Sequence, residues 1–134
     1  MAGERLVVLY DEDCRWCRWS VARLVAFDRD RRLRLVPIQG EEGDRLLAGV
    51  PEGERLESAH AVTPDGRVHS GGDAAAPVAS VLPALSFGVP LLTALPGPTR
   101  AAYRLVADNR SRLGGRLNDE AVAKADRLIA SRRD

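Results

Sequence analysis

Cys14 and Cys17 are the residues of this sequence whose type and spacing suit chemistry most directly. Two residues between cysteines at a helix start let the sulfurs approach closely enough to form a disulfide. The unpaired backbone N–H groups there also favour a thiolate, which is the nucleophile in thiol-disulfide exchange. We therefore expect Cys14 to attack a disulfide and Cys17, buried one turn further along, to resolve the mixed disulfide that results.

The charged residues around the pair predict opposing effects on a thiolate. Arg15 and Arg18 are expected to stabilise it, whereas the acidic run of Asp11, Glu12 and Asp13 is expected to oppose it. The direction of exchange, reducing or oxidising, stays open for that reason.

Two tryptophans share the neighbouring face of the same predicted helix. Trp16 and Trp19 are interpreted as residues of the core or of a cleft wall. Because Trp16 lies between the cysteines, it is also placed to contact a substrate, although the core is the favoured interpretation.

Two other interpretations of the cysteine pair stay open. A structural zinc site needs two further ligands, and His60 and His69 lie far along the chain without the spacing typical of such sites. They are interpreted as structural or exposed histidines. A packed, chemically idle pair is the second alternative, because free cysteine is among the residues most often buried.

Composition and charge fit one ordinary globular domain. The chain has 134 residues, of which 45% are hydrophobic and 29% charged, and such a chain needs no disulfide or metal staple to fold. We expect one domain over residues 1–134, with a core at about 5–87 and a helical extension at about 88–134. The net charge of +1 comes from mixed acids and bases, so neither nucleic acid nor a membrane is an expected partner.

The start of the chain carries no evident targeting signal. Residues 1–5 lack the basic start, apolar run and cleavage site of a secretory signal, and no apolar run approaches the length of a membrane span. We expect a cytoplasmic protein. Structural disulfides are rare there, so a CxxC pair indicates redox or metal chemistry.

The elements that must position the pair begin with a strand. Residues 5–10 (RLVVLY) are apolar and β-branched, which predicts a buried strand. Residues 15–28 carry apolar side chains at the spacing of one helical face, with Asp13 as the expected N-cap. Residues 33–38 predict a second strand, which Pro37 confines to an edge or to its own end.

A hairpin and a second core helix follow. Strands expected at 58–63 and 67–70 flank Pro64-Asp65-Gly66, a strong turn signal. Residues 73–85 predict a helix capped by Asp73. The order strand-helix-strand and then strand-strand-helix predicts an α/β fold with a thioredoxin-like βαβ-ββα core.

Further helices are expected outside this core. Residues 89–95 form a short apolar segment between prolines, whereas 41–50, 99–113 and 118–131 are expected to be helical. Several arginines give the third helical region a local excess of positive charge, which is interpreted as a solvated face. They are Arg100, Arg104, Arg110, Arg112 and Arg116.

The motif Tyr10-Asp11-Glu12-Asp13-Cys14-Arg15-Trp16-Cys17 resembles the Y-D-G-D-C-x-x-C signature of the DCC family of thiol-disulfide oxidoreductases. Further matches are 63–68 (TPDGRV), 72–74 (GDA) and 103–110 (YRLVADNR), so the resemblance spans about residues 5 to 113. It implies a thioredoxin-like fold, Cys14 and Cys17 as the redox pair, and Asp11 and Asp13 as residues that frame it.

Two departures bear on the site. Glu12 stands where the family usually has glycine, so a tight positive-φ turn there is less expected. Residues 57–59, which approach the hairpin, lack the cis-proline that ordinary thioredoxins place beside the active site. Substrate binding by strand addition at this point is correspondingly less expected.

These observations predict a thiol-disulfide oxidoreductase that uses no cofactor and no metal. The expected substrate is a disulfide-bearing protein or a small thiol, and the reductant is unidentified. The rival from another class is a redox-sensing or protein-interaction module of the same fold without turnover. The candidate site comprises Cys14 and Cys17 as catalytic residues, supported by Asp11, Asp13, Arg15 and Trp16.

Overall fold

A mixed four-stranded sheet forms the centre of the protein, whose computed structural model describes residues 5–132. The strand order is β2-β1-β3-β4. β1 (Leu6–Tyr10) pairs in parallel with β2 (Leu33–Pro37) and antiparallel with β3 (His60–Val62), which pairs antiparallel with β4 (Val68–Ser70). The predicted α/β fold with a thioredoxin-like core and additional C-terminal helices is confirmed.

The central strand is buried on both faces, so β1 joins two hydrophobic cores. Successive side chains on a strand point to opposite faces. Leu6, Val8 and Tyr10 therefore pack into one core, and Val7 and Leu9 pack into the other. This double burial explains why the strand reads as a continuous apolar run rather than as an alternating one.

Helices cover the two faces of the sheet. α1 (Arg15–Phe27) and α3 (Ala75–Val81) contribute to the core beneath Val8, whereas the chain around α2 (Glu41–Leu46) contributes Leu47 to the core beneath Leu9. α1 thus leaves the end of β1 and packs back along one face of the sheet, as in a right-handed parallel crossover to β2. The first residues of α1 lie where β1 ends.

Turn chemistry and proline act at the edges of the sheet as predicted. Pro37 ends β2, which is an edge strand. Gly66 has φ +91° in the hairpin turn, a conformation that glycine adopts without steric cost. The Thr63 N–H donates to the Arg67 carbonyl at 3.0 Å, which closes this turn.

The prediction that Asp73 caps the second core helix is wrong. A 3₁₀ turn (Gly71–Ala74) precedes α3, and the Asp73 carboxylate accepts a hydrogen bond from Arg100 Nε at 2.6 Å instead. The carboxylate is drawn to this ion pair because α5 packs against the 3₁₀ turn.

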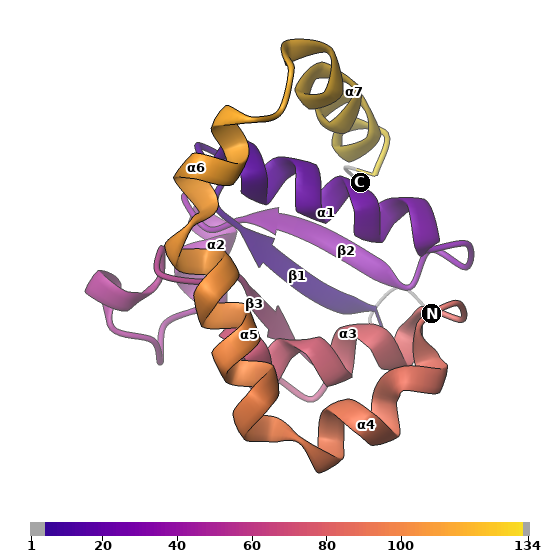
Figure 1. The fold of residues 1–134 in the computed structure, drawn as a ribbon. Coiled ribbons are helices and arrows are strands. Elements are labelled where there is room, and N and C mark those ends of the chain that lie inside the picture. Colours follow the sequence, from indigo (N-terminus) through magenta and orange to yellow (C-terminus); the bar gives the residue numbers. More distant parts are fainter. Residues whose placement is uncertain (1–4, 133–134) are drawn as a thin grey trace.

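The C-terminal third consists of four helices: α4 (Val89–Ala94), α5 (Pro96–Asp108), α6 (Arg110–Gly115) and α7 (Asp119–Ala130). The single helix expected over 99–113 is broken at Asn109, whose side-chain amide donates to the Leu105 carbonyl at 2.7 Å. In Figure 1, α5 runs from α4 back toward α6, which lies by the start of α1. The break therefore lets the chain change direction beside the cysteines.

α7 is part of the main core. The Asn118 side chain caps it by accepting from the Ala121 N–H at 2.7 Å. α7 lies alongside α1 (Figure 1), and its residues Ala125 and Ile129 join the core of α1 and β1. Just beyond it, Arg132 pairs with the fully buried Asp28 at 2.8 Å, which ties the two ends of this helix pair together.

Candidate redox site

The sulfur of Cys14 caps its own helix. Cys14 has extended backbone angles (φ −99°, ψ 118°) and its Sγ accepts a hydrogen bond from the Cys17 N–H at 3.2 Å. Asp13 was expected in this role, and the structure corrects it because a turn closed by Cys14 N–H to the Asp11 carbonyl places the cap one residue later. The helix N-terminus therefore acts on the thiol directly.

The two thiols are driven to opposite protonation states. Hydrogen bonding from the Cys17 thiol, aided by its backbone N–H, lowers the pKa of Cys14 to about 6, against a burial effect that raises it. The same hydrogen bond to Cys14, together with burial, raises the pKa of Cys17. Both cysteines are free and half-buried. At neutral pH the pair therefore holds one thiolate, on Cys14, and one proton, on Cys17.

The acidic turn before the pair is held by hydrogen bonds. Asp11 Oδ1 accepts from the Asp13 N–H at 2.9 Å and from Gln39 Nε2 at 2.6 Å, and the side-chain oxygen Oε1 of Gln39 accepts from the Glu12 N–H at 3.2 Å. Arg31 is the non-glycine residue with positive φ among residues 5–132, so Glu12 sits in an ordinary conformation. The negative charge of Asp11 raises the pKa of Cys14, against the hydrogen bonds that lower it.

Arg15 and Arg18 have partners other than the thiolate. Arg15 donates to the carbonyls of Gly114 at 3.3 Å and Leu117 at 2.8 Å, while Arg18 Nε pairs with Asp126 at 3.0 Å. These bonds hold α6 and α7 against α1, and Arg18 Nη1 also donates to the Glu12 carbonyl at 2.9 Å. That the two arginines stabilise the thiolate stays a prediction. Arg15 supports the site by fixing the helices around it.

Gly114 permits this close packing at the helix start. A Cβ on Gly114 would lie 3.2 Å from both the Cβ of Arg15 and the backbone nitrogen of Trp16. Contacts this tight would force α6 away from the start of α1. The absence of a side chain thus keeps the end of α6 beside the CxxC segment.

Arg110 is a cation that acts on both thiols, and the sequence did not indicate this role. Its positive charge lowers the pKa of Cys14 as well as that of Cys17. Arg110 Nη2 donates to the Leu56 carbonyl at 2.8 Å, which holds the guanidinium in place. Arg110 is the first residue of α6 and had been interpreted as part of a solvated face. In the sequence, a role for Arg110 was indicated only by its position at the end of segment 103–110, which resembles the family.

Tyr103 is a second residue that the chemistry of the sequence did not indicate. Its hydroxyl accepts the Ala59 N–H at 2.8 Å, and the Ala59 carbonyl accepts the Gly71 N–H at 3.0 Å. Both backbone groups of Ala59 are therefore occupied just before β3. An extended peptide has no free hydrogen-bonding groups on this residue, in line with the weakened expectation of strand addition.

The tryptophans stack against each other. The ring centroids of Trp16 and Trp19 are 5.0 Å apart and both side chains are half-buried, with Arg23 placed over the Trp19 ring. Trp16 lines a cavity that also contains Cys17. Of the two interpretations made from the sequence, the cleft wall describes Trp16 better than the core.

His60 is a structural histidine. It is buried, its Nε2 lies 2.8 Å from the Arg55 carbonyl and its Nδ1 lies 2.7 Å from the Ser70 hydroxyl. Because a carbonyl only accepts, Nε2 carries the proton and Nδ1 accepts from Ser70. Burial lowers the pKa of His60 and keeps it neutral. Over residues 5–132, no three histidine, cysteine or acidic side chains are grouped to hold a metal ion.

The comparisons with known proteins agree with this geometry. No curated protein and no solved structure matches the chain. Residues 8–116 match the model of the family described as DCC1-like thiol-disulfide oxidoreductase, a stretch that includes the cysteine pair, Tyr103 and Arg110. On the strength of that match, which covers most of its length, the chain belongs to the DCC1-like thiol-disulfide oxidoreductase family.

Proposed function

We propose that the protein exchanges disulfides, with Cys14 as the attacking thiolate and Cys17 as the resolving thiol. The observation that carries this proposal is the Cys14 sulfur at the N-cap of α1, 3.2 Å from the Cys17 N–H. A sulfur there is ionised at neutral pH and half exposed, which is the combination a nucleophilic cysteine needs.

The exchange runs in two balanced steps. The Cys14 thiolate attacks one sulfur of a substrate disulfide, forms a mixed disulfide and releases the other sulfur as a thiolate. The Cys17 thiol then loses its proton and attacks Cys14 Sγ, which closes the Cys14–Cys17 disulfide and releases the second substrate thiol. The protein leaves this cycle two electrons more oxidised, so an external thiol reductant must return it to the dithiol.

The lowered pKa of Cys14 to about 6 also bears on direction. A stabilised thiolate favours the reduced form of the pair, which makes its disulfide a better oxidant. A stabilised thiolate therefore eases the return of the oxidised protein to the dithiol by the external thiol reductant. The substrate is a disulfide-bearing protein or a small thiol compound, no cofactor takes part, and a cytoplasmic location is proposed.

Trapping in single-cysteine variants tests the assignment. Cys17→Ser should accumulate a mixed disulfide on Cys14 when incubated with glutathione disulfide, because the attack that releases it is lost. Cys14→Ser should trap far less, because Cys17 lies within α1 away from the N-cap position and burial still raises the pKa of its thiol. Intact-mass spectrometry measures both, and equal trapping would reject the two roles. Turnover of insulin or bis(2-hydroxyethyl) disulfide by the wild type separates an enzyme from a sensor that cycles only once.

A further inference from the structure

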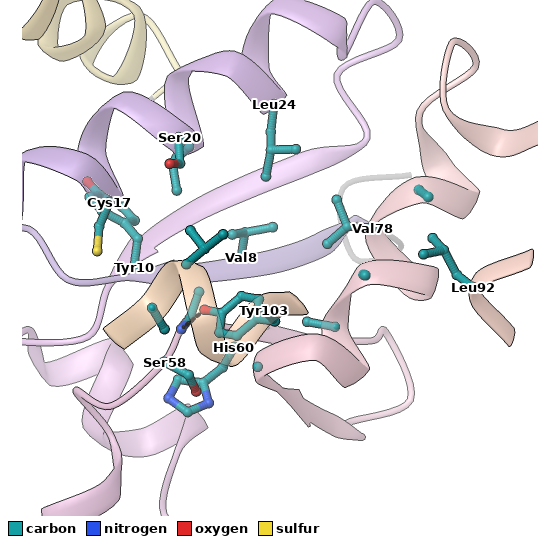
Figure 2. A pocket seen from close by; sticks show the side chains of 18 of the residues that line it. Val8, Tyr10, Cys17, Ser20, Leu24, Ser58, His60, Val78, Leu92 and Tyr103 are labelled. Atoms are coloured by element: carbon teal, nitrogen blue, oxygen red, sulfur yellow. Dashed lines mark hydrogen bonds between the residues drawn. The ribbon is translucent and has the colours of Figure 1, made fainter. Parts of the chain in front are cut away.

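A cavity of about 560 Å³ opens beside Cys17, whose backbone N–H is hydrogen-bonded to Cys14 Sγ at 3.2 Å. Cys17 and Tyr10 lie at one end of it, and Val78 and Leu92 lie at the other end (Figure 2). Its volume falls within the range of sites that enclose small organic molecules, about 300–1,000 Å³. The thiol chemistry therefore has a preformed chamber at its side.

The lining is apolar except near the thiols. Along most of its length the wall is formed by aliphatic and small side chains of β1, α1, α3 and α4, such as Val8, Leu24 and Val78. Asp11 and Arg110 are the charged residues among those that line it. Both act on the charge of the cysteines, so they mark the thiol end. An occupant with a neutral apolar body and a reacting sulfur at one end matches this distribution.

The mouth of the cavity is also apolar. Phe87 and Leu91 belong to the lining and are 84% and 64% exposed. Large apolar side chains left in water beside an apolar cavity are typical of a ligand entrance. They favour a ligand that enters with apolar surface rather than a charged peptide or a sugar.

The backbone next to the cavity argues against an extended polypeptide as the occupant. Ala59 lines the cavity, but its N–H is bound to Tyr103 and its carbonyl to Gly71. Recognition of an extended chain by strand addition relies on free backbone groups. With both groups of Ala59 used internally, this residue offers a ligand only apolar surface.

Resting on the function proposed above, we infer that the substrate is a small disulfide whose sulfur carries a neutral alkyl or aryl group, and that this group occupies the cavity. The Cys14 thiolate attacks the sulfur bearing the apolar group and displaces the other thiolate. Cys17, in the cavity wall, then attacks Cys14 and releases the apolar thiol. The two electrons come from the protein dithiol, which an external dithiol restores.

Matched disulfides test the inference on the wild-type protein. Bis(2-hydroxyethyl) disulfide and dipropyl disulfide have the same number of heavy atoms, and dibutyl disulfide adds one methylene on each sulfur. The pre-reduced protein is mixed with each disulfide, and the rate of Cys14–Cys17 disulfide formation is measured by mass spectrometry. Each rate is divided by the rate at which free glutathione reacts with the same disulfide, which corrects for the intrinsic reactivity of that disulfide. We expect the dipropyl compound to exceed the hydroxyethyl one, with a further gain of roughly fourfold per buried methylene.

Two pairs of variants test whether the preference for apolar disulfides arises in the cavity. Leu91→Asp places a charge in the lining and should reduce the dibutyl-to-hydroxyethyl ratio about tenfold, whereas Leu105→Asp, at an exposed position outside the lining, should keep it. Ala75→Leu fills the cavity and should reduce the ratio as well, unlike its neighbour Ala76→Leu, which lies outside the lining. Thermal denaturation verifies that each variant folds.

The outcomes separate this inference from the proposed function. If all three disulfides oxidise the protein at the same normalised rate, the proposed exchange chemistry stands and the inference of an apolar substrate is overturned. A flat ratio together with faster oxidation by peptide disulfides flanked by aromatic residues also overturns it and assigns the cavity to a polypeptide. Failure of the wild type to react with any disulfide, including the hydroxyethyl one, overturns the proposed function itself.

Discussion

The hydroxyl of Tyr103 on α5 holds the backbone N–H of Ala59 at 2.8 Å, across a sequence separation of 44 residues. This bond ties α5 to the segment that enters β3, on the side of the sheet where the thiols lie. Burial raises the pKa of Tyr103, so the phenol stays neutral and remains bound to the amide over the whole physiological range.

Removing this hydroxyl should loosen the approach to β3. Tyr103→Phe leaves the Ala59 N–H without its partner, and we expect a loss of about 1–2 kcal/mol in the free energy of unfolding. Urea denaturation measures the loss, and hydrogen exchange at the Ala59 amide should accelerate locally. A variant as stable as the wild type with unchanged exchange would show that water replaces the hydroxyl fully.

The pH dependence of alkylation follows from the lowered pKa of Cys14. Because the thiolate is the reactive form and its pKa is about 6, the rate with iodoacetamide should fall as pH drops through 6 and level off above about 7. Cys17, whose pKa is raised, should stay unreactive through this interval. Peptide mapping after timed quenching assigns each rate to its cysteine. A midpoint near the ordinary cysteine value would contradict the capping geometry.

Arg110 should tune this midpoint. Arg110→Ala removes a positive charge that lowers the pKa of Cys14, so the midpoint should move upward and alkylation at pH 6 should slow by about twofold. Arg110→Lys keeps the charge and should recover part of the rate. Arg112→Ala, an exposed arginine on the same helix, is the matched control and should leave the profile in place. High salt should shrink the difference between Arg110→Ala and the wild type.

Arg15, by contrast, should matter for stability more than for reactivity. Arg15→Ala loses hydrogen bonds to the carbonyls of Gly114 and Leu117, which should cost about 1–2 kcal/mol of unfolding free energy. The pH midpoint of Cys14 alkylation should change less than in Arg110→Ala. The opposite ranking of the two variants would support the thiolate-stabilising role that the sequence predicts for Arg15.

The buried pair of Asp28 and Arg132 should be a strong anchor for the end of the chain. Asp28 is fully buried and also accepts the N–H groups of Arg32 and Leu33 at 2.8 and 3.0 Å. Asp28→Asn leaves the Arg132 guanidinium without its anion and turns an amide donor toward the backbone N–H groups of Arg32 and Leu33. We therefore expect a loss of about 3 kcal/mol in the free energy of unfolding. Asp30→Asn, at an exposed neighbouring position, is the control and should be close to neutral in thermal denaturation.

The sequence by itself determined the features that are local in the chain. The β-branched run before Asp11, the CxxC at a helix start and the turn around Gly66 all follow from residues a few positions apart, and each appears in the structure. The order of strands and helices then limited the topology to the observed sheet, because parallel strands need a crossover helix and adjacent antiparallel strands need only a turn.

Only the tertiary structure decided which side chains surround the thiols. Arg15 and Arg18 lie next to the cysteines in sequence, yet most of their partners are 99 to 108 residues away. Arg18 also binds the Glu12 carbonyl nearby. Arg110 and Tyr103 reach the site because the chain breaks at Asn109 and α5 packs against the 3₁₀ turn before α3. A charge acts through distance in space, so sequence proximity did not indicate Arg110. The cavity beside Cys17 likewise exists only once α3, α4 and α5 close around the sheet.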